Sequence, residues 1–167
     1  MIAEEAIKTA INYETKIRDI YLEGAEAVGD DAGRRFFKAM GSDEQSHLDY
    51  LNQLLVQLQK TGKLSAARLE SAIPSREEIE READVIQSQM AQDDHGLKQQ
   101  MLSKALKVEI ETSAFYRKMV ADMPAEGKPI FARFLEIEDN HIHAVQFELD
   151  YIAKTGYWFN FKEFDME

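Results

Sequence analysis

The sequence contains no cysteine, only 3 prolines and 8 glycines in 167 residues, and no long uncharged apolar run. Without cysteine the chain cannot form disulfides, thiolate zinc sites, iron–sulfur clusters or a cysteine nucleophile, so any metal must be held by oxygen and imidazole nitrogen. Hydrophobic residues make up 44% and charged residues 31%. This balance, with so few helix breakers, excludes a disordered or collagen-like chain and predicts an all-α protein.

Positive charge is also scarce, since 20 Lys and Arg stand against 31 Asp and Glu, a net charge of −11. Nucleic acids and anionic membranes both favour clustered Lys and Arg, so we expect neither as a partner. The first residues, MIAEEAIKTAI, carry acids where a signal peptide carries bases. No stretch approaches the roughly 18 apolar residues of a membrane span. We therefore expect a soluble cytoplasmic protein.

Four long segments have apolar residues three and four positions apart, the pattern of an amphipathic helix. The predicted helices are residues 3–27, 31–60, 97–122 and 127–154. The linkers VGDDAG and DMPAEGKP are short and rich in helix breakers, so each pair of helices is expected to form an antiparallel hairpin. A chain of this length usually builds one core, so residues 1–167 are expected to form a single domain.

The two predicted hairpins, residues 3–60 and 97–154, are separated by a long crossover, residues 61–96. Ser75 and Glu78 have the spacing of a capping box and predict a helix start within it. The apolar face of this helix is expected to contain Ile79, Ala83, Ile86 and Met90. We expect the crossover to let the second hairpin start at the end of the bundle where the first one began.

The hairpins also resemble one another in sequence, which is economically explained by an internal repeat. At an offset of 95, Ala10, Glu14 and Tyr21 align with Ala105, Glu109 and Tyr116. At an offset of 94, Phe37, Glu44, His47, Lys60, Thr61 and Gly62 align with Phe131, Glu138, His141, Lys154, Thr155 and Gly156. The second turn is one residue shorter, which accounts for the change of offset.

The repeated acidic residues predict a metal site inside the bundle, the alternative being a polar core or a pattern of surface charges. Each lies about 15 residues from its hairpin turn, so at 1.5 Å per residue all lie roughly 22 Å from the turns, at one level. They are Glu14, Glu44, Glu109 and Glu138, and His47 and His141 follow the second and fourth by three residues. Four ionised carboxylates in a core would each cost several kcal/mol. Two divalent cations would neutralise them, and oxygen with imidazole suits iron or manganese, with zinc also possible.

These motifs resemble those of the ferritin-like di-iron carboxylate superfamily, and within it the rubrerythrin-type proteins. Glu14 and Glu109 match the helices with one glutamate, and the two Glu-x-x-His motifs match the other two helices. The resemblance implies a ferritin-like four-helix bundle of two hairpins that holds two iron ions. It further implies an oxidoreductase that reduces peroxide or activates dioxygen.

The sequence departs from the rubrerythrin pattern in two places. Rubrerythrins usually carry a further carboxylate one turn after the third-helix glutamate, where this chain has Thr112. They also commonly carry a rubredoxin-like domain, which a chain without cysteine cannot form, so electrons must come from a separate donor protein. The alternatives are a ferroxidase or other iron-handling protein, a manganese catalase, and a non-enzymatic metal carrier or sensor.

Three further residues are candidates for supporting the metal ligands. Tyr21 and Tyr116 each lie two turns after a proposed ligand, so their hydroxyls are expected to hydrogen-bond ligating carboxylates, the alternative being that both fill the core. Asp43 precedes Glu44 and is a candidate to orient the imidazole of the opposite motif, although the second copy has Ile137 there.

The remaining features are expected to be structural. His143 points away from the ligand face and His95 falls in the crossover, so both are expected to be solvated. Gly41 is expected to permit a close helix approach or a local bulge, the alternative being a tolerated helix defect that costs about 1 kcal/mol. The tail, residues 155–167, is rich in aromatic side chains. It is expected to fold back on its own bundle, with a dimer contact as the alternative, and the protein is expected to be a homodimer.

Overall fold

The computed structural model describes residues 2–65, 68–85 and 95–159. This part of the chain contains five helices and no strand. The helices are α1 (Ile2–Ala27), α2 (Asp31–Thr61), α3 (Arg76–Val85), α4 (His95–Asp122) and α5 (Lys128–Thr155). All eight bounds of the four long helices lie within two residues of the predicted ones, because the apolar periodicity is continuous between clear breakers.

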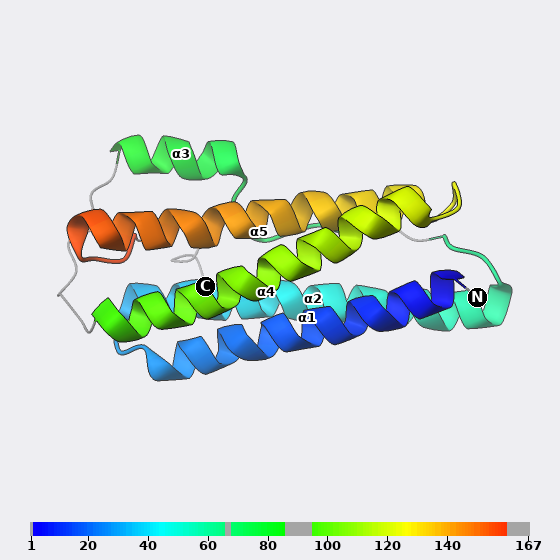
Figure 1. Cartoon of the computed structure of the whole chain (residues 1–167), viewed down its shortest axis with the longest axis horizontal. Coiled ribbons are helices and arrows are strands. Elements are labelled where there is room, and N and C mark those ends of the chain that lie inside the picture. The colour runs from blue at the N-terminus through cyan, green and yellow to red at the C-terminus, as the bar shows by residue number, and fades with distance from the viewer. Residues whose placement is uncertain (1, 66–67, 86–94, 160–167) are drawn as a thin grey trace.

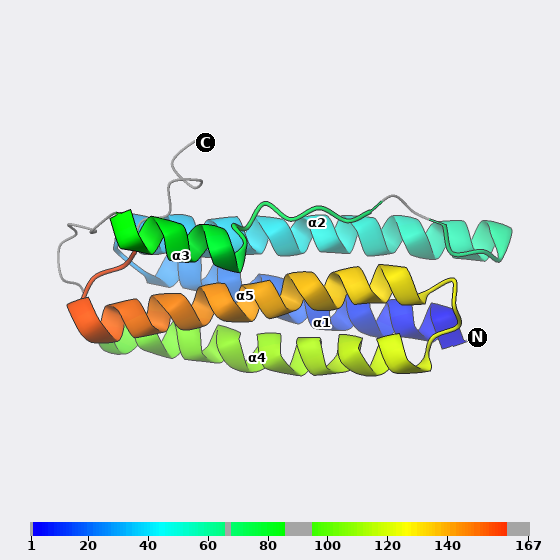
Figure 2. The same cartoon turned by 90° about the horizontal axis from the view of Figure 1, so that it is seen from above.

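The four long helices form a bundle, and α3 lies on its outside (Figure 1). The pairs that pack most extensively are α1 with α2, α4 with α5, and α1 with α4, whereas α3 contacts α5. Figures 1 and 2 show the two helices of each hairpin running antiparallel, and α1 running antiparallel to α4. The prediction of an all-α bundle made from two hairpins is therefore confirmed. No helix in the described ranges combines the length and apolar character needed to cross a bilayer.

The prediction for the start of the second hairpin is wrong. Figure 1 shows α4 beginning at the end of the bundle where α1 turns into α2, not at the end where α1 begins. The physical reason is simple: α2 already returns the chain to the start of α1, so a crossover as long as the bundle carries it back again. The segment between α2 and α3 runs lengthwise along the bundle (Figure 2), and the two hairpin turns lie at opposite ends.

Local capping defines several helix ends. Asp30 precedes α2 and accepts a hydrogen bond from a first-turn N–H, which satisfies a donor that has no partner within the helix. Gly62 and Gly156 end α2 and α5 with φ of 71° and 78°, a left-handed conformation that glycine adopts without strain. The capping box that precedes α3 is confirmed: Ser75 N donates to Glu78 at 3.0 Å, and Glu78 N donates to the Ser75 hydroxyl at 3.3 Å.

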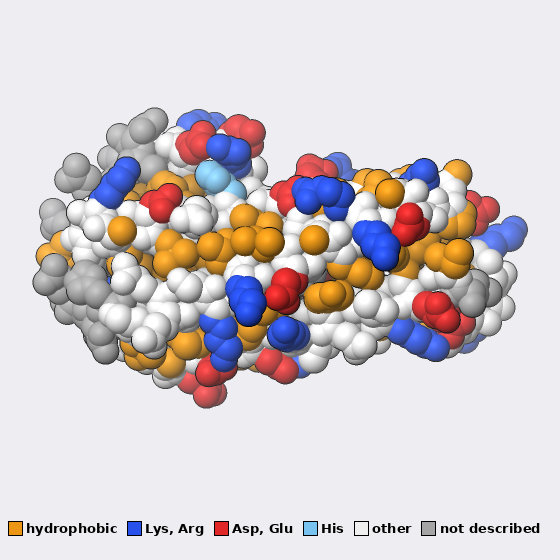
Figure 3. Space-filling view, viewed as in Figure 1, with side chains coloured by type: hydrophobic (Ala, Val, Ile, Leu, Met, Phe, Trp, Pro, Cys, Tyr) orange, Lys and Arg blue, Asp and Glu red, His pale blue; other side chains and the backbone are white. Residues whose placement is uncertain are grey.

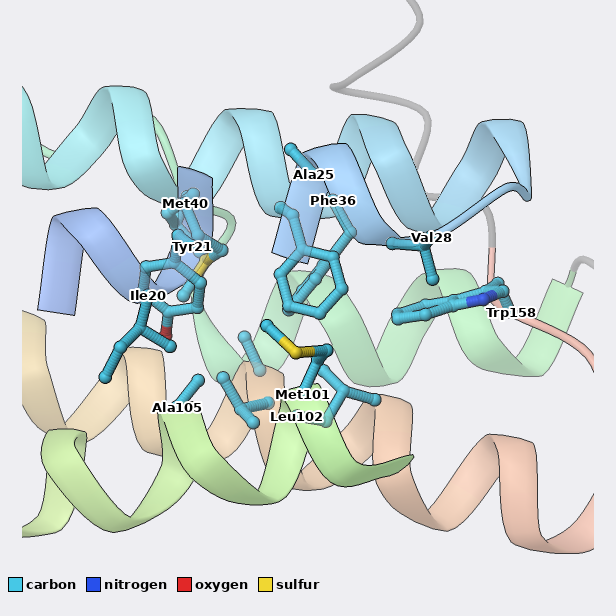
Figure 4. Packing of buried hydrophobic residues seen from close by; sticks show 14 of the residues in the cluster. Ile20, Tyr21, Ala25, Val28, Phe36, Met40, Met101, Leu102, Ala105 and Trp158 are labelled. Carbon is cyan, nitrogen blue, oxygen red and sulfur yellow. The ribbon is translucent and has the colours of Figure 1, made fainter. Parts of the chain in front are cut away.

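Two apolar clusters fill the bundle on either side of its middle. Figure 4 shows part of the first cluster, in which Tyr21, Phe36 and Met101 project from three helices, with Trp158 at one edge. Trp158 and Phe159 are fully buried, so this part of the tail folds back on its own bundle as predicted. Phe161 and Phe164 of the same tail lie outside the described residues.

Gly41 serves a close approach between α1 and α2. The helix continues through it without a bulge. A β-carbon at this position would lie 3.2 Å from Leu22 Cδ2 and 3.5 Å from Tyr21 Cβ. The absence of a β-carbon at Gly41 therefore lets α1 pack tightly against α2, close to the level of the acidic residues.

Candidate metal centre

A layer of polar residues separates the two apolar clusters of the bundle. α1 and α4 each contribute one glutamate, and α2 and α5 each contribute a glutamate and a histidine three residues later. All six side chains are 0% exposed. They are Glu14, Glu44, His47, Glu109, Glu138 and His141, the residues predicted as metal ligands. Six ionisable groups without access to bulk water must neutralise one another or bind ions.

These side chains form two sets that overlap. One set contains Glu14 and His47, the other contains Glu109 and His141, and both sets include Glu44 and Glu138. In each set, one nitrogen or oxygen atom per residue can be chosen so that all four atoms lie within 4.8 Å of one another. Each set could therefore hold a metal ion, and α2 and α5 supply the two carboxylates that the sets share.

The two imidazole rings are arranged symmetrically about the shared carboxylates. His47 Nδ1 lies 3.0 Å from Glu44 and 3.2 Å from Glu138, and His141 Nδ1 lies 2.7 Å and 3.6 Å from the same two residues. The rings are nearly parallel, at 10°, with centroids 5.5 Å apart. In both histidines Nδ1 thus faces the carboxylates and is the nitrogen placed to bind a metal.

Two tyrosines connect the hairpins through this layer. The Tyr21 hydroxyl on α1 donates to Glu109 Oε1 on α4 at 2.5 Å, and the Tyr116 hydroxyl on α4 donates to Glu14 Oε1 on α1 at 2.6 Å. Both predicted tyrosines therefore bond proposed ligands, but each bonds the glutamate of the other hairpin. Burial and the nearby carboxylates raise the pKa of both tyrosines well above its usual range, so both hydroxyls remain donors.

Asp43 lies behind both histidines, on the side away from the glutamates. Its Oδ2 is 2.8 Å from His141 Nε2 and 3.4 Å from His47 Nε2. The contact with the opposite motif, predicted for this residue, is thus present. Sequence reasoning missed two donors from the crossover, the Ser71 hydroxyl at 2.7 Å and the Ala72 N–H at 2.9 Å. No periodic signal could have found them, because both lie in irregular backbone.

The surroundings raise the pKa of the two shared glutamates and lower the pKa of the other two. Burial and the neighbouring negative charges raise the pKa of Glu44 and Glu138 well above its usual range. Burial acts the same way on Glu14, but the hydrogen bond with Glu44 and the charge of His47 outweigh it and lower the pKa to about 2. The pKa of Glu109 is also lowered, because His141 outweighs its burial. The metal-free layer therefore holds protons on the shared pair.

The histidines complete this protonation pattern. Burial lowers the pKa of His47 and His141, but the surrounding carboxylates dominate and raise it well above its usual range. Two imidazolium groups offset two of the three carboxylates whose pKa is lowered, Glu14, Glu109 and Asp43, so protons balance most of the charge of the metal-free layer. Divalent cations would take over this role by displacing the protons.

Several atoms in the layer lack the hydrogen bonds that buried polar groups normally make. Among the described residues, these include Glu44 Oε2, Glu109 Oε2 and both carboxylate oxygens of Glu138. Each of these oxygens is available to a cation, and oxygen with imidazole is a donor set that iron and manganese accept. The residues present therefore fit a metal pair.

A cleft of about 470 Å³ lies between α5 and the segment that leads into α3, where Figure 3 shows the surface hollowed beside α3. Ser71, Ile137 and Asn140 line it, and they neighbour the buried layer in sequence or by contact. His143 also lines this cleft with its side chain only 23% exposed. His143 thus lies away from the candidate ligands, as predicted, but it is only partly solvated because the crossover covers part of it. The side chain of His95 lies outside the described residues.

The structure thus brings together every residue that the sequence nominated for the metal site, and it adds the crossover contacts to Asp43. What the centre does is not indicated by relatives. No family model, no curated protein and no solved structure matches this chain.

Proposed function

We propose that this protein is a rubrerythrin-like di-iron oxidoreductase with a ferritin-like bundle, which reduces peroxide or activates dioxygen. The observation that carries the proposal is the pair of four-residue sets that share Glu44 and Glu138. A structural salt-bridge network would not need two equivalent sets with matching imidazole nitrogens. Two adjacent ions with common carboxylates do need them.

The residues would divide between two iron ions as the two sets divide. Glu14 and His47 would serve one ion, Glu109 and His141 the other, and the two shared glutamates would serve both. When bound, iron supplies redox and Lewis-acid chemistry. Four carboxylates against two divalent ions leave no net charge, which makes burial of the centre tolerable.

The protein itself would select the substrate and hold the ligands in place. Because all six side chains are fully buried, only a small molecule such as peroxide or dioxygen can reach them without opening the bundle. Tyr21 and Tyr116 fix one oxygen of each unshared glutamate, and Asp43 fixes an imidazole. Reduction of hydrogen peroxide breaks its O–O bond, takes up two electrons and two protons, and releases two water molecules. A separate donor protein would supply the electrons.

The proposal is tested with anaerobically purified protein. Two iron ions per chain, an optical band of an oxygen-bridged pair after peroxide addition, and sustained peroxide consumption with an electron donor are the expected results. Peroxide dismutation by manganese-loaded protein without a donor would indicate a catalase instead. Rapid ferrous oxidation by a large multi-subunit cage would indicate a ferroxidase. Tight metal binding without any turnover would indicate a carrier or sensor.

A further inference from the structure

The two histidines differ in how closely a carboxylate approaches the Nε2 atom of the ring. Asp43 immediately precedes Glu44, and the corresponding position before Glu138 is Ile137. Hence the layer has one aspartate for two imidazoles, although its six candidate ligands are arranged almost symmetrically. The distances reflect this, because Asp43 Oδ2 lies 2.8 Å from His141 Nε2 but 3.4 Å from His47 Nε2.

The crossover determines which histidine Asp43 serves. A carboxylate oxygen has two lone-pair positions. The Ser71 hydroxyl, at 2.7 Å, and His141 Nε2–H, at 2.8 Å, occupy both positions of Oδ2. The Ala72 N–H donates to Oδ1 at 2.9 Å and fixes the plane of the carboxylate. Within the described residues, His47 Nε2 is consequently buried without a hydrogen bond.

A carboxylate that accepts the distal N–H of an imidazole fixes the ring and makes its other nitrogen a better ligand. We propose that the two metal positions are therefore unequal: the position with Glu109 and His141 fills first and binds more tightly, and the position with Glu14 and His47 is the exchangeable one. Ser71 is the positioning residue that sets this difference. The inference rests on the metal pair of the proposed function and does not depend on which reaction the pair performs.

The ranking of the two positions is measured with Co²⁺ as the probe, titrated into metal-free protein and followed by visible absorption against a competing chelator. Two separated binding steps are not sufficient evidence, because two adjacent cations repel each other in a symmetric site as well. The decisive comparison is the affinity for the first Co²⁺ in His141→Ala and in His47→Ala. We expect it to fall by about 10- to 100-fold in His141→Ala, and to stay within about twofold of the wild type in His47→Ala.

The role of Ser71 is measured in the same titration. Ser71→Ala frees a lone pair of Asp43 Oδ2 for His47, so the affinity for the second Co²⁺ should rise, by up to about tenfold, and the two steps should converge. The matched control is Ser75→Ala, which removes another hydroxyl of the same crossover and the same cleft but makes no bond to Asp43. The control should leave both steps at their wild-type values.

The possible outcomes separate this inference from the proposed function. If wild-type protein binds fewer than two Co²⁺ per chain, the proposal of a metal pair is wrong, and the inference that rests on it is overturned as well. If two ions bind but the two histidine variants lose the first step equally, only the inference is overturned. The inference is likewise overturned if Ser71→Ala and Ser75→Ala give the same binding curve.

Discussion

The hydroxyl of Tyr21 lies 2.5 Å from Oε1 of Glu109, a residue 88 positions later in the chain and on a different helix. Tyr116 makes the reciprocal bond to Glu14 at 2.6 Å. The two hairpins are therefore held together at mid-height by hydrogen bonds to the groups that would bind metal. A substitution that breaks one of these hydrogen bonds should consequently lower both the stability of the bundle and its affinity for metal.

Tyr21→Phe should weaken both properties. It removes a donor to a buried, ionised carboxylate while it keeps the ring, and such a hydrogen bond contributes about 1.5–3 kcal/mol. We expect a loss of unfolding free energy of that order in urea denaturation. Metal affinity should fall by about 10- to 100-fold, the usual cost of losing a partner of a ligand.

Tyr13→Phe is the matched control for Tyr21→Phe, because Tyr13 lies on the same helix and its ring stacks on Phe115, 5.0 Å away. That stacking survives removal of the hydroxyl, so stability and metal affinity should stay near their wild-type values. Equal losses in both variants would mean that the Tyr21 bond does not support the ligands.

Substitution of a candidate ligand should lower the metal content, whereas substitution of a histidine outside the buried sets should not. Glu44→Ala should cut the bound metal sharply because Glu44 belongs to both buried sets, and His47→Ala should lose the ion of the one set that contains His47, both measured by elemental analysis. His143→Ala, which changes a histidine of the cleft, should retain it. A loss in His143→Ala as severe as in His47→Ala would contradict the assignment.

Removal of the metal with a chelator should lower the melting temperature of wild-type protein, since a metal bound only by the native state stabilises it.

Metal affinity should increase with pH across the neutral range. The pKa of His47 and of His141 is raised, as is that of Glu44 and of Glu138, so the metal-free layer holds protons that the ions must displace. Calorimetric titration with Co²⁺ in buffers of different ionisation enthalpy counts these protons. Binding without proton release, or with an affinity independent of pH, would contradict the protonation pattern.

The metal-free protein should show the opposite trend, losing stability as pH rises. Groups whose folded pKa is raised bind more protons in the native state, so their stabilising contribution is present at low pH and is lost as pH passes the folded pKa. The folded pKa is lowered in three other carboxylates, Glu14, Glu109 and Asp43. These groups change the unfolding free energy with pH only below about pH 4.5, where they titrate in the unfolded chain. Between pH 5 and 9, roughly, denaturant unfolding of metal-free protein should therefore give a falling free energy. A flat or rising profile would show that the buried protons are absent.

Two glycines of α2 should tolerate alanine very differently. A β-carbon at Gly33 would lie 2.5 Å from Cε2 of the fully buried Trp158, so Gly33→Ala should displace the tail and cost about 1–3 kcal/mol. A β-carbon at Gly41 would meet the end of Leu22, which is 47% exposed and can move aside. Gly41→Ala should change stability by no more than about 1 kcal/mol. Thermal unfolding together with Trp158 fluorescence compares them, and equal effects would contradict the packing of the tail.

The sequence predicts the helices and the position of the candidate ligands well because both depend on regular geometry. Apolar periodicity and breakers locate the helix ends, and a constant rise per residue places Glu14 and Glu138 at one level although 124 positions separate them. The burial of these carboxylates then means that protons or cations must balance their charge. Homodimer formation, the metal identity and the electron donor remain predictions.

The contacts that the sequence could not supply depend on how the hairpins dock. Periodicity shows that Tyr21 shares a face with Glu14, but not that it reaches Glu109 on the other hairpin. The path of the crossover is irregular, so neither the bond from Ser71 to Asp43 nor the cover over His143 follows from spacing. The direction of the second hairpin could not be predicted for the same reason, because it depends on the path of the crossover and not on its length alone.

Thr112 tests how closely the chemistry follows the rubrerythrin-type proteins that the sequence resembles. In those proteins a further carboxylate at this position is thought to give one metal an alternative ligand, which keeps the peroxide reaction cycling. Here Thr112 is fully buried and its hydroxyl donates to the Val108 carbonyl, 2.7 Å away in its own helix. It offers the centre no charged ligand.

Thr112→Glu should therefore consume peroxide faster than wild-type protein, since the new side chain lies one turn beyond Glu109 on nearly the same helix face. The measurement is peroxide consumption by reduced protein under saturating electron donor, with metal content determined for each sample. Thr112→Gln is the matched control, because glutamine has the same shape as glutamate and brings the same crowding without the charge. We expect only the glutamate variant to gain activity. If the rates of all three proteins are equal at equal metal content, a missing carboxylate does not limit the reaction, and the near symmetry of the six ligands is sufficient for it.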